Sequence, residues 1–98
     1  MKICIVGCGL IGTKRAKAAK SLGCDDFVFV DIKLSFAKKL AQVFGGTAYS
    51  DFKQALDENL DIEAVIISTL HWALSDLSII SIRNGLPTLI EKPGAFAY

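Results

Sequence analysis

Short, continuous runs of apolar residues recur along this chain, and longer segments with apolar residues at helical spacing separate them. Continuous runs rich in branched and aromatic side chains are typical of parallel strands that are covered on both faces. The sequence therefore predicts strands over residues 3–6, 27–30, 47–49, 64–68 and 88–90.

The segments between these strands carry helix signals. They contain few helix breakers, place apolar residues at every third or fourth position, and meet glycine where a helix should stop. Ser50 is expected to cap the short third helix. The sequence predicts helices over residues 13–21, 34–44, 51 to about 57, and 74 to Asn84-Gly85.

Strands and helices alternate along the chain, so right-handed crossovers should join the strands into a parallel sheet. We predict a single domain over residues 1–98, of the α/β class, with a doubly wound parallel sheet in three α/β/α layers. The expected strand order is 3-2-1-4-5. In this order the loops that bind ligands meet at the carboxyl ends of the first and fourth strands.

Composition fits this class and excludes several partners. Hydrophobic residues make up 52% of the 98 residues and charged residues 21%, which is typical of a small globular domain. The net charge of +1 gives no broad field that would attract nucleic acid or an acidic membrane. No segment approaches the roughly 20 apolar residues that cross a bilayer, so we expect a cytoplasmic protein with neither partner.

The cysteines Cys4, Cys8 and Cys24 are odd in number and scattered. Their spacing matches neither a disulfide framework nor a zinc site, so we predict reduced thiols and no metal. Cys8 could act as a redox sensor, but its position in a glycine-rich turn makes its backbone N–H more important than its thiol.

That turn, Gly7-Cys8-Gly9-Leu10-Ile11-Gly12, follows the first predicted strand directly. A Rossmann-type dinucleotide site needs one glycine for a tight turn, one for close approach of the diphosphate, and one for packing of the helix on the strand. Three glycines can also mark an ordinary structural turn, which is the alternative. The strand before it and the helix after it favour dinucleotide binding.

Asp31 ends the second predicted strand, where a carboxylate can accept hydrogen bonds from the adenosine ribose. Ile32 follows it at the same edge and is included in the predicted cofactor site. A carboxylate repels the 2′-phosphate of NADP, so Asp31 favours NAD, although Lys33 nearby offsets part of this preference.

The loop after the fourth strand should flank the nicotinamide half of the cofactor. It carries Ser68, Thr69 and His71, which we include in the predicted cofactor site. A lone histidine after a strand also commonly serves as a capping or packing group, and that alternative stays open for His71.

The last predicted strand runs into Glu91-Lys92-Pro93. Together with the glycine turn, Asp31, Ser68-Thr69 and Asn84-Gly85, this tripeptide makes the whole chain resemble the Gfo/Idh/MocA family of glucose-fructose oxidoreductases and inositol dehydrogenases. The resemblance implies that Lys92 lies beside the nicotinamide and the reacting carbon, as a cofactor-binding and catalytic residue, and that Glu91 fixes the loop. It also implies hydride transfer to or from a sugar or cyclitol.

Members of this family continue into a second, substrate-binding domain, so we expect this chain to be the NAD(P)-binding domain of an oxidoreductase that is not catalytic by itself. The alternative is a non-catalytic dinucleotide sensor, or a subunit that completes its site with a partner chain. The sheet edge at residues 88–90 could pair with that partner or with a second copy. Binding of S-adenosylmethionine is a third reading, but it leaves Glu91-Lys92-Pro93 unexplained.

Overall fold

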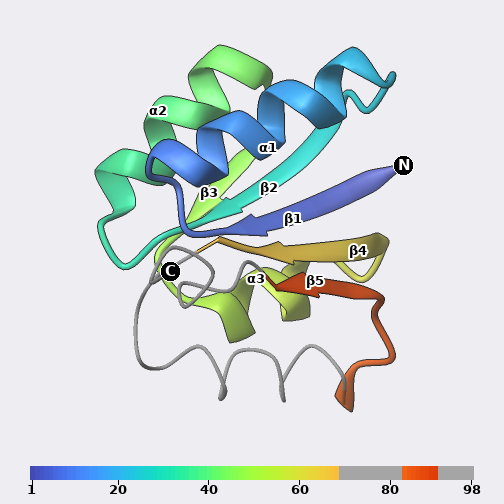
Figure 1. The fold of residues 1–98 in the computed structure, drawn as a ribbon. Helices are drawn as coiled ribbons and strands as arrows, with labels where there is room; N and C mark the ends of the chain where they lie inside the picture. Colours follow the sequence, from blue (N-terminus) through green and yellow to red (C-terminus); the bar gives the residue numbers. More distant parts are fainter. Residues whose placement is uncertain (69–82, 91–98) are drawn as a thin grey trace, which may run out of the picture.

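The computed structural model describes residues 1–68 and 83–90, in which strands alternate with helices (Figure 1). The elements are β1 (Lys2–Val6), α1 (Leu10–Ser21), β2 (Asp26–Val30), α2 (Leu34–Phe44), β3 (Thr47–Tyr49), α3 (Phe52–Glu58), β4 (Ile62–Ile67) and β5 (Thr88–Ile90). All five predicted strands are therefore confirmed. The helix predicted from residue 74 falls mostly on residues 69–82, outside the described part.

The sheet confirms the predicted topology. Its order is β3-β2-β1-β4-β5, and every neighbouring pair is parallel. The chain steps outward from β1 in one direction through β2 and β3, and then returns to the other side of β1 for β4. The carboxyl ends of β1 and β4 lie side by side, with Val6 opposite Ile67. This is the predicted place at which the two halves of the sheet diverge.

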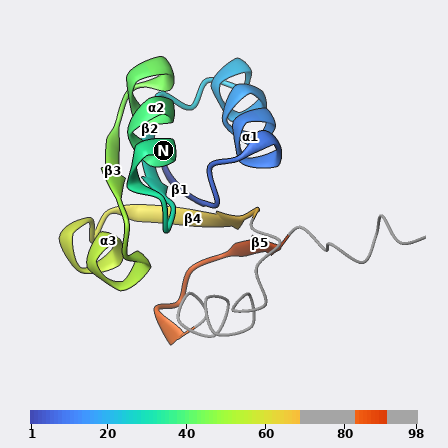
Figure 2. The ribbon, with the colours of Figure 1, turned by 90° about the vertical axis from the view of Figure 1, so that its left-hand side faces the viewer.

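The helices cover the sheet in layers. Figures 1 and 2 show α1 and α2 on one face of the sheet and α3 on the opposite face. The three-layer α/β/α arrangement is thus present in the described residues. Because helices cover both faces, β1 and β2 need apolar side chains on both sides of the sheet, which explains the continuous apolar runs over residues 3–6 and 27–30.

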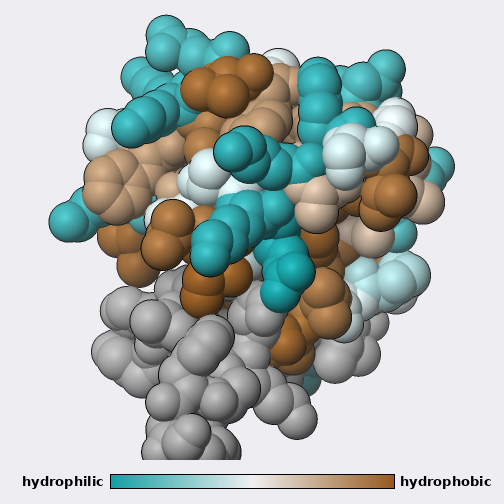
Figure 3. Space-filling model, turned by 45° about the horizontal axis from the view of Figure 1, so that its top comes forward, coloured by the Kyte–Doolittle hydropathy of each residue, from teal (hydrophilic) through white to brown (hydrophobic). Residues whose placement is uncertain are grey.

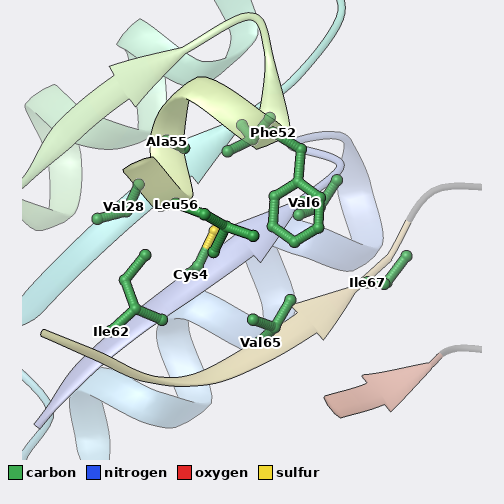
Figure 4. Close-up of a cluster of buried hydrophobic side chains, with 10 residues drawn as sticks. Cys4, Val6, Val28, Phe52, Ala55, Leu56, Ile62, Val65 and Ile67 are labelled. Atoms are coloured by element: carbon green, nitrogen blue, oxygen red, sulfur yellow. The ribbon is translucent and has the colours of Figure 1, made fainter. Parts of the chain in front are cut away.

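Alternate residues of the strands point to opposite faces of the sheet and contribute to two separate hydrophobic cores. Cys4 and Val6 of β1 pack with Phe52 and Leu56 of α3 on one face, as Figure 4 shows. On the other face, side chains of β1 and β2 pack under α1 and α2 with Phe44. The rings of Phe27 and Phe29 are stacked there, with centroids 5.4 Å apart.

Most element ends agree with the sequence predictions to within one residue, but three features need correction. Helix α1 begins at Leu10, three residues earlier than predicted, because Gly9 serves as its N-cap. The cap of α3 is Asp51, whose Oδ2 accepts a hydrogen bond from the Gln54 N–H at 3.3 Å, and the prediction of Ser50 was wrong. Strand β4 begins earlier, at Ile62, because the exposed Glu63 sits at an irregularity in the pairing with β1 and interrupts the apolar run without ending the strand.

The backbones of β1's end and α1's start approach each other closely. Gly7 has a φ of 94°, a conformation that favours glycine. A Cβ atom on Gly12 would overlap the carbonyl oxygen of Gly7 and lie 3.6 Å from Cγ2 of Ile5. The predicted structural roles of Gly7 and Gly12 are confirmed.

Replacing Gly12 with alanine should therefore destabilise the domain by roughly 1–3 kcal/mol, since the helix must move away from the strand. For a domain of this size that loss lowers the melting temperature by about 4–8 °C per kcal/mol, measurable by circular dichroism. Gly9→Ala is the control, because a Cβ at Gly9 meets no atom within 4 Å. Equal melting temperatures for Gly12→Ala and the wild type would contradict the packing role.

Candidate functional site

A hollow of about 390 Å³ lies where the strands end and α1 begins. It is lined by residues of the glycine turn together with Asp31, Phe36 and Ser68. In Figure 1 the arrowheads of β1, β2 and β4 point toward this side of the sheet, where α1 begins. The hollow therefore joins three segments that are far apart in the sequence.

Backbone hydrogen bonds hold the strand ends around this hollow. The Gly7 N–H donates to the carbonyl of Val30 at 2.7 Å, and the Ser68 N–H donates to the carbonyl of Val6 at 2.7 Å. These bonds continue the sheet by one residue beyond β1 and β4. The turn and Ser68 consequently keep fixed positions relative to the end of β2.

The N-terminus of α1 opens into the hollow. The first N–H groups of a helix have no partner within the helix, and they carry the positive end of its dipole. No side chain caps α1 at Gly9, and its first turn contains no acidic residue. Gly9 also leaves open space where a side chain would otherwise project. Such an end is suited to a phosphate group.

Asp31 is half-buried at the tip of β2, and both of its carboxylate oxygens accept backbone hydrogen bonds. Oδ2 accepts from the Cys8 N–H at 2.8 Å, and Oδ1 accepts from the Lys33 N–H at 2.9 Å. A carboxylate has about four acceptor positions, so each oxygen can accept one further bond. Asp31 can thus receive hydroxyl groups of a ligand while it stays anchored to the protein.

Ser68 adds an independent observation about the hollow. The residue is 7% exposed, and its Oγ has no hydrogen-bond partner among the described residues. A buried hydroxyl without a partner costs about 1–3 kcal/mol, so such groups are normally satisfied. Because Ser68 lines the hollow, a polar ligand bound there would satisfy it. The residues present therefore fit a ligand with phosphate and hydroxyl groups.

The environment of the Cys8 thiol does not favour reactivity. It is buried, and it donates a hydrogen bond to the Val30 carbonyl at 3.4 Å. Burial raises the pKa of Cys8 to about 12, and the negative charge of Asp31 contributes to the rise. A thiol with this pKa stays protonated at neutral pH, which argues against the redox alternative.

Phe36 is a site residue that the sequence analysis missed. It lies in the first turn of α2, is 44% exposed, and lines the hollow. The Lys33 ammonium lies 5.5 Å from the centre of its ring, a cation–π contact. The sequence contained one signal for this role, since Phe36 is apolar but falls outside the inward-facing positions of α2.

The structure does not bring all of the predicted residues to the hollow. Gly12 is buried, and a Cβ there would overlap Gly7, as described above. Ile32 is 74% exposed and does not line the hollow. Thr69, His71, Glu91 and Lys92 lie outside the described residues. The predicted residues that line the hollow are Gly7, Gly9, Leu10, Ile11, Asp31 and Ser68.

Residues 1–68 and 83–90 hold neither a cluster of metal ligands nor a membrane-spanning helix. No three side chains of histidine, cysteine, aspartate or glutamate group there as a metal site. No helix in that part has the length and apolar character that crossing a membrane requires.

The parallel sheet, the glycine turn and the acidic residue at the tip of β2 define an NAD(P)-binding Rossmann domain. A family model described as an oxidoreductase family with an NAD-binding Rossmann fold matches residues 1–98. The chain belongs to this family, Gfo/Idh/MocA.

Curated relatives of the chain include dehydrogenases of two kinds. An L-aspartate dehydrogenase from Methanococcus maripaludis is 33% identical over 102 residues, which cover 99% of this chain and 37% of that protein. The myo-inositol dehydrogenase Hyg17 from Streptomyces leeuwenhoekii is 33% identical over 94 residues, which cover 95% of this chain and 28% of that protein. The chain thus spans about a third of the length of these relatives.

Solved structures share the fold. GenD2 from gentamicin A biosynthesis, solved in complex with NAD, has a TM-score of 0.82 at 21% identity, covering 95% of this chain and 27% of that one. The 3-ketoreductase KijD10 from Actinomadura kijaniata, solved with NADP and TDP-benzene, has a TM-score of 0.79 at 22% identity, covering 95% and 29%. One structure carries NAD and the other NADP, so the fold alone does not select between them.

Buried thiols should react slowly with an aromatic disulfide reagent at pH 8. Burial raises the pKa values of both Cys4 and Cys8, so the reactive thiolate is scarce in the folded protein. We expect these two thiols to react only as fast as the protein unfolds, and at once in denaturant. The absorbance of the released aromatic thiolate measures the reaction. A Cys4→Ala, Cys24→Ala double variant isolates Cys8. Rapid labelling of that folded variant would contradict the assignment of Cys8 as unreactive.

Proposed function

We propose that the hollow holds a nicotinamide dinucleotide, and that NAD is preferred over NADP. The observation that carries this proposal is the convergence of an uncapped helix N-terminus, an anchored carboxylate and a buried unpartnered hydroxyl on one hollow. Each matches a different part of a dinucleotide, and a structural glycine turn requires none of them.

The N–H groups at the start of α1 would hold the diphosphate, because they are positive and Gly9 permits close approach. Asp31 would accept the adenosine ribose hydroxyls, and Phe36 would supply an apolar wall beside it. Ser68 would bind a polar group on the nicotinamide side. Bound NAD would supply the carbon that accepts or returns a hydride.

The preference for NAD rests on charge. A 2′-phosphate near Asp31 would meet a carboxylate that two backbone N–H groups hold in place. The ammonium of Lys33 would offset only part of this repulsion, because it lies over the ring of Phe36.

For the complete reaction we propose hydride transfer between the nicotinamide and an alcohol or carbonyl carbon of a sugar or cyclitol. Inositol dehydrogenases and a sugar ketoreductase among the similar proteins support this substrate class. Lys92 would lie near the reacting carbon, where an ammonium stabilises negative charge on a substrate oxygen. An amino acid is the second candidate substrate, because an L-aspartate dehydrogenase matches nearly the whole chain.

A second candidate role is a dinucleotide-binding sensor, or a subunit that completes its site with a partner chain. An exposed edge of the sheet supports this role. Strand β5 lies at one edge of the sheet, with Leu89 53% exposed, and a partner chain would pair there. Three free cysteines support a reducing, cytoplasmic location for either role.

Calorimetry with NAD tests the proposed ligand directly. The wild type should release heat on binding NAD, and its melting temperature should rise with NAD concentration. Gly9→Ala should weaken binding about tenfold or more, since a methyl group would occupy the space that the diphosphate needs. Its melting temperature without NAD should match the wild type. Neither heat nor thermal protection with NAD or NADP at millimolar concentration would refute dinucleotide binding.

Asp31→Ser should relax the choice of cofactor. Removing the carboxylate removes the repulsion of the 2′-phosphate, so the ratio of NAD affinity to NADP affinity should fall about tenfold or more. The matched control is Asp57→Ser, which removes one charge from α3 on the opposite face of the sheet. An unchanged ratio in Asp31→Ser would show that Asp31 does not select the cofactor.

A further inference from the structure

The hydrogen bond from the Cys8 N–H to Oδ2 of Asp31 joins the diphosphate-binding turn to the end of β2. Cys8 stands between Gly7 and Gly9, so fixing its peptide group also fixes the glycines on either side. The two residues are 23 positions apart in the sequence. Through this bond the side chain that follows β2 contacts the backbone of the turn.

Two neighbouring N–H groups hold the turn, and they do so in different ways. The Gly7 N–H donates to the main-chain carbonyl of Val30, a bond that any residue at position 30 can provide. The Cys8 N–H depends on the side chain at position 31. Cys8 is 5% exposed with that side chain in place. Without the carboxylate its N–H would bond to a mobile water from the adjoining hollow or lose its partner, and in either case the turn would be held less firmly.

The carboxylate of Asp31 is itself held from both sides. Oδ1 accepts the Lys33 N–H while Oδ2 accepts the Cys8 N–H. Hydrogen bonds to a charged oxygen are about twice as strong as neutral ones. The position of the carboxylate and the position of the turn therefore depend on each other.

We propose that Asp31 is a positioning residue for the diphosphate-binding turn, in addition to its proposed contact with the ribose. This inference rests on the proposed function, because the turn is taken to hold the diphosphate. A ligand that displaces the carboxylate, as a 2′-phosphate would, also removes the bond that holds the Cys8 peptide. NADP would then bind more weakly than NAD for two reasons. Its 2′-phosphate is repelled by the carboxylate, and the displaced carboxylate no longer positions the turn that binds the diphosphate.

Asp31→Ala and Asp31→Asn form a matched pair that separates this role from charge. Both variants remove the negative charge. The asparagine keeps one oxygen that can accept the Cys8 N–H, whereas alanine keeps none. Any difference between the two variants at the turn therefore reports the hydrogen bond.

Nuclear magnetic resonance on the ligand-free, nitrogen-15-labelled protein gives the first measurement. We expect the Cys8 amide proton of Asp31→Ala to move upfield, with changes at Gly9 and Leu10, whereas Asp31→Asn stays closer to the wild type. The second measurement is titration with inorganic pyrophosphate, which has no ribose. Asp31→Ala should bind it about fivefold more weakly than Asp31→Asn, the effect of one typical hydrogen bond.

Equal pyrophosphate affinities for the two variants, with equal amide shifts at Gly9 and Leu10, would overturn the proposal. If Asp31→Ala does not fold, the scalar coupling across the hydrogen bond between the Cys8 nitrogen and the Asp31 carboxyl carbon decides in the wild type. Its presence supports the proposal, and its absence overturns it. Lack of NAD binding by the wild type would refute the proposed function but leave the shift comparison intact, so the two failures are distinguishable.

Discussion

The backbone contact between α1 and the end of β1 sets the geometry on which the rest of this domain depends. Gly12 lies against the carbonyl of Gly7, and no side chain fits between them. This contact fixes how closely the helix approaches the sheet and where its first N–H groups lie. Because the Gly7 N–H is bonded to Val30 and the Ser68 N–H to Val6, the same contact also places the turn relative to the ends of β2 and β4. The hollow is a consequence of strand order and this one close approach.

The sequence was sufficient to predict the central strands because most residues of β1 and β2 are buried between helices on both faces, which requires continuous apolar runs. Element order then restricted the topology, since crossovers have one favoured hand. Local competition was harder to resolve. Ser50 and Asp51 are both good capping residues, and in the structure the Asp51 side chain accepts the hydrogen bond from the Gln54 N–H. Glu63 stands just before the predicted strand 64–68, and a pairing irregularity accommodates it within β4.

Some features of the site could likewise be predicted from local sequence, whereas others depend on tertiary contacts. The glycine turn and Asp31 carry their signals in residue type and spacing, so their placement at one hollow follows from the fold. The bond between Cys8 and Asp31 depends on the register between two segments that spacing does not specify. Phe36 enters the site because α2 starts close to the tip of β2. Contacts of this kind require coordinates, since the sequence pattern assigns such residues only to exposed helix positions.

The arrangement also explains how one domain can serve different reactions in its family. Inositol and aspartate dehydrogenases match this chain over nearly all of its length, although their names denote different substrates. The polar groups at the hollow are suited to phosphate and hydroxyl groups, which every dinucleotide cofactor contains. Within the described residues the Ser68 hydroxyl has no hydrogen-bond partner, and the first N–H groups of a helix have none inside the helix. A ligand that satisfies them stabilises the folded state by mass action. Binding at the proposed cofactor site would therefore stabilise this small domain through the same polar groups that bind the ligand.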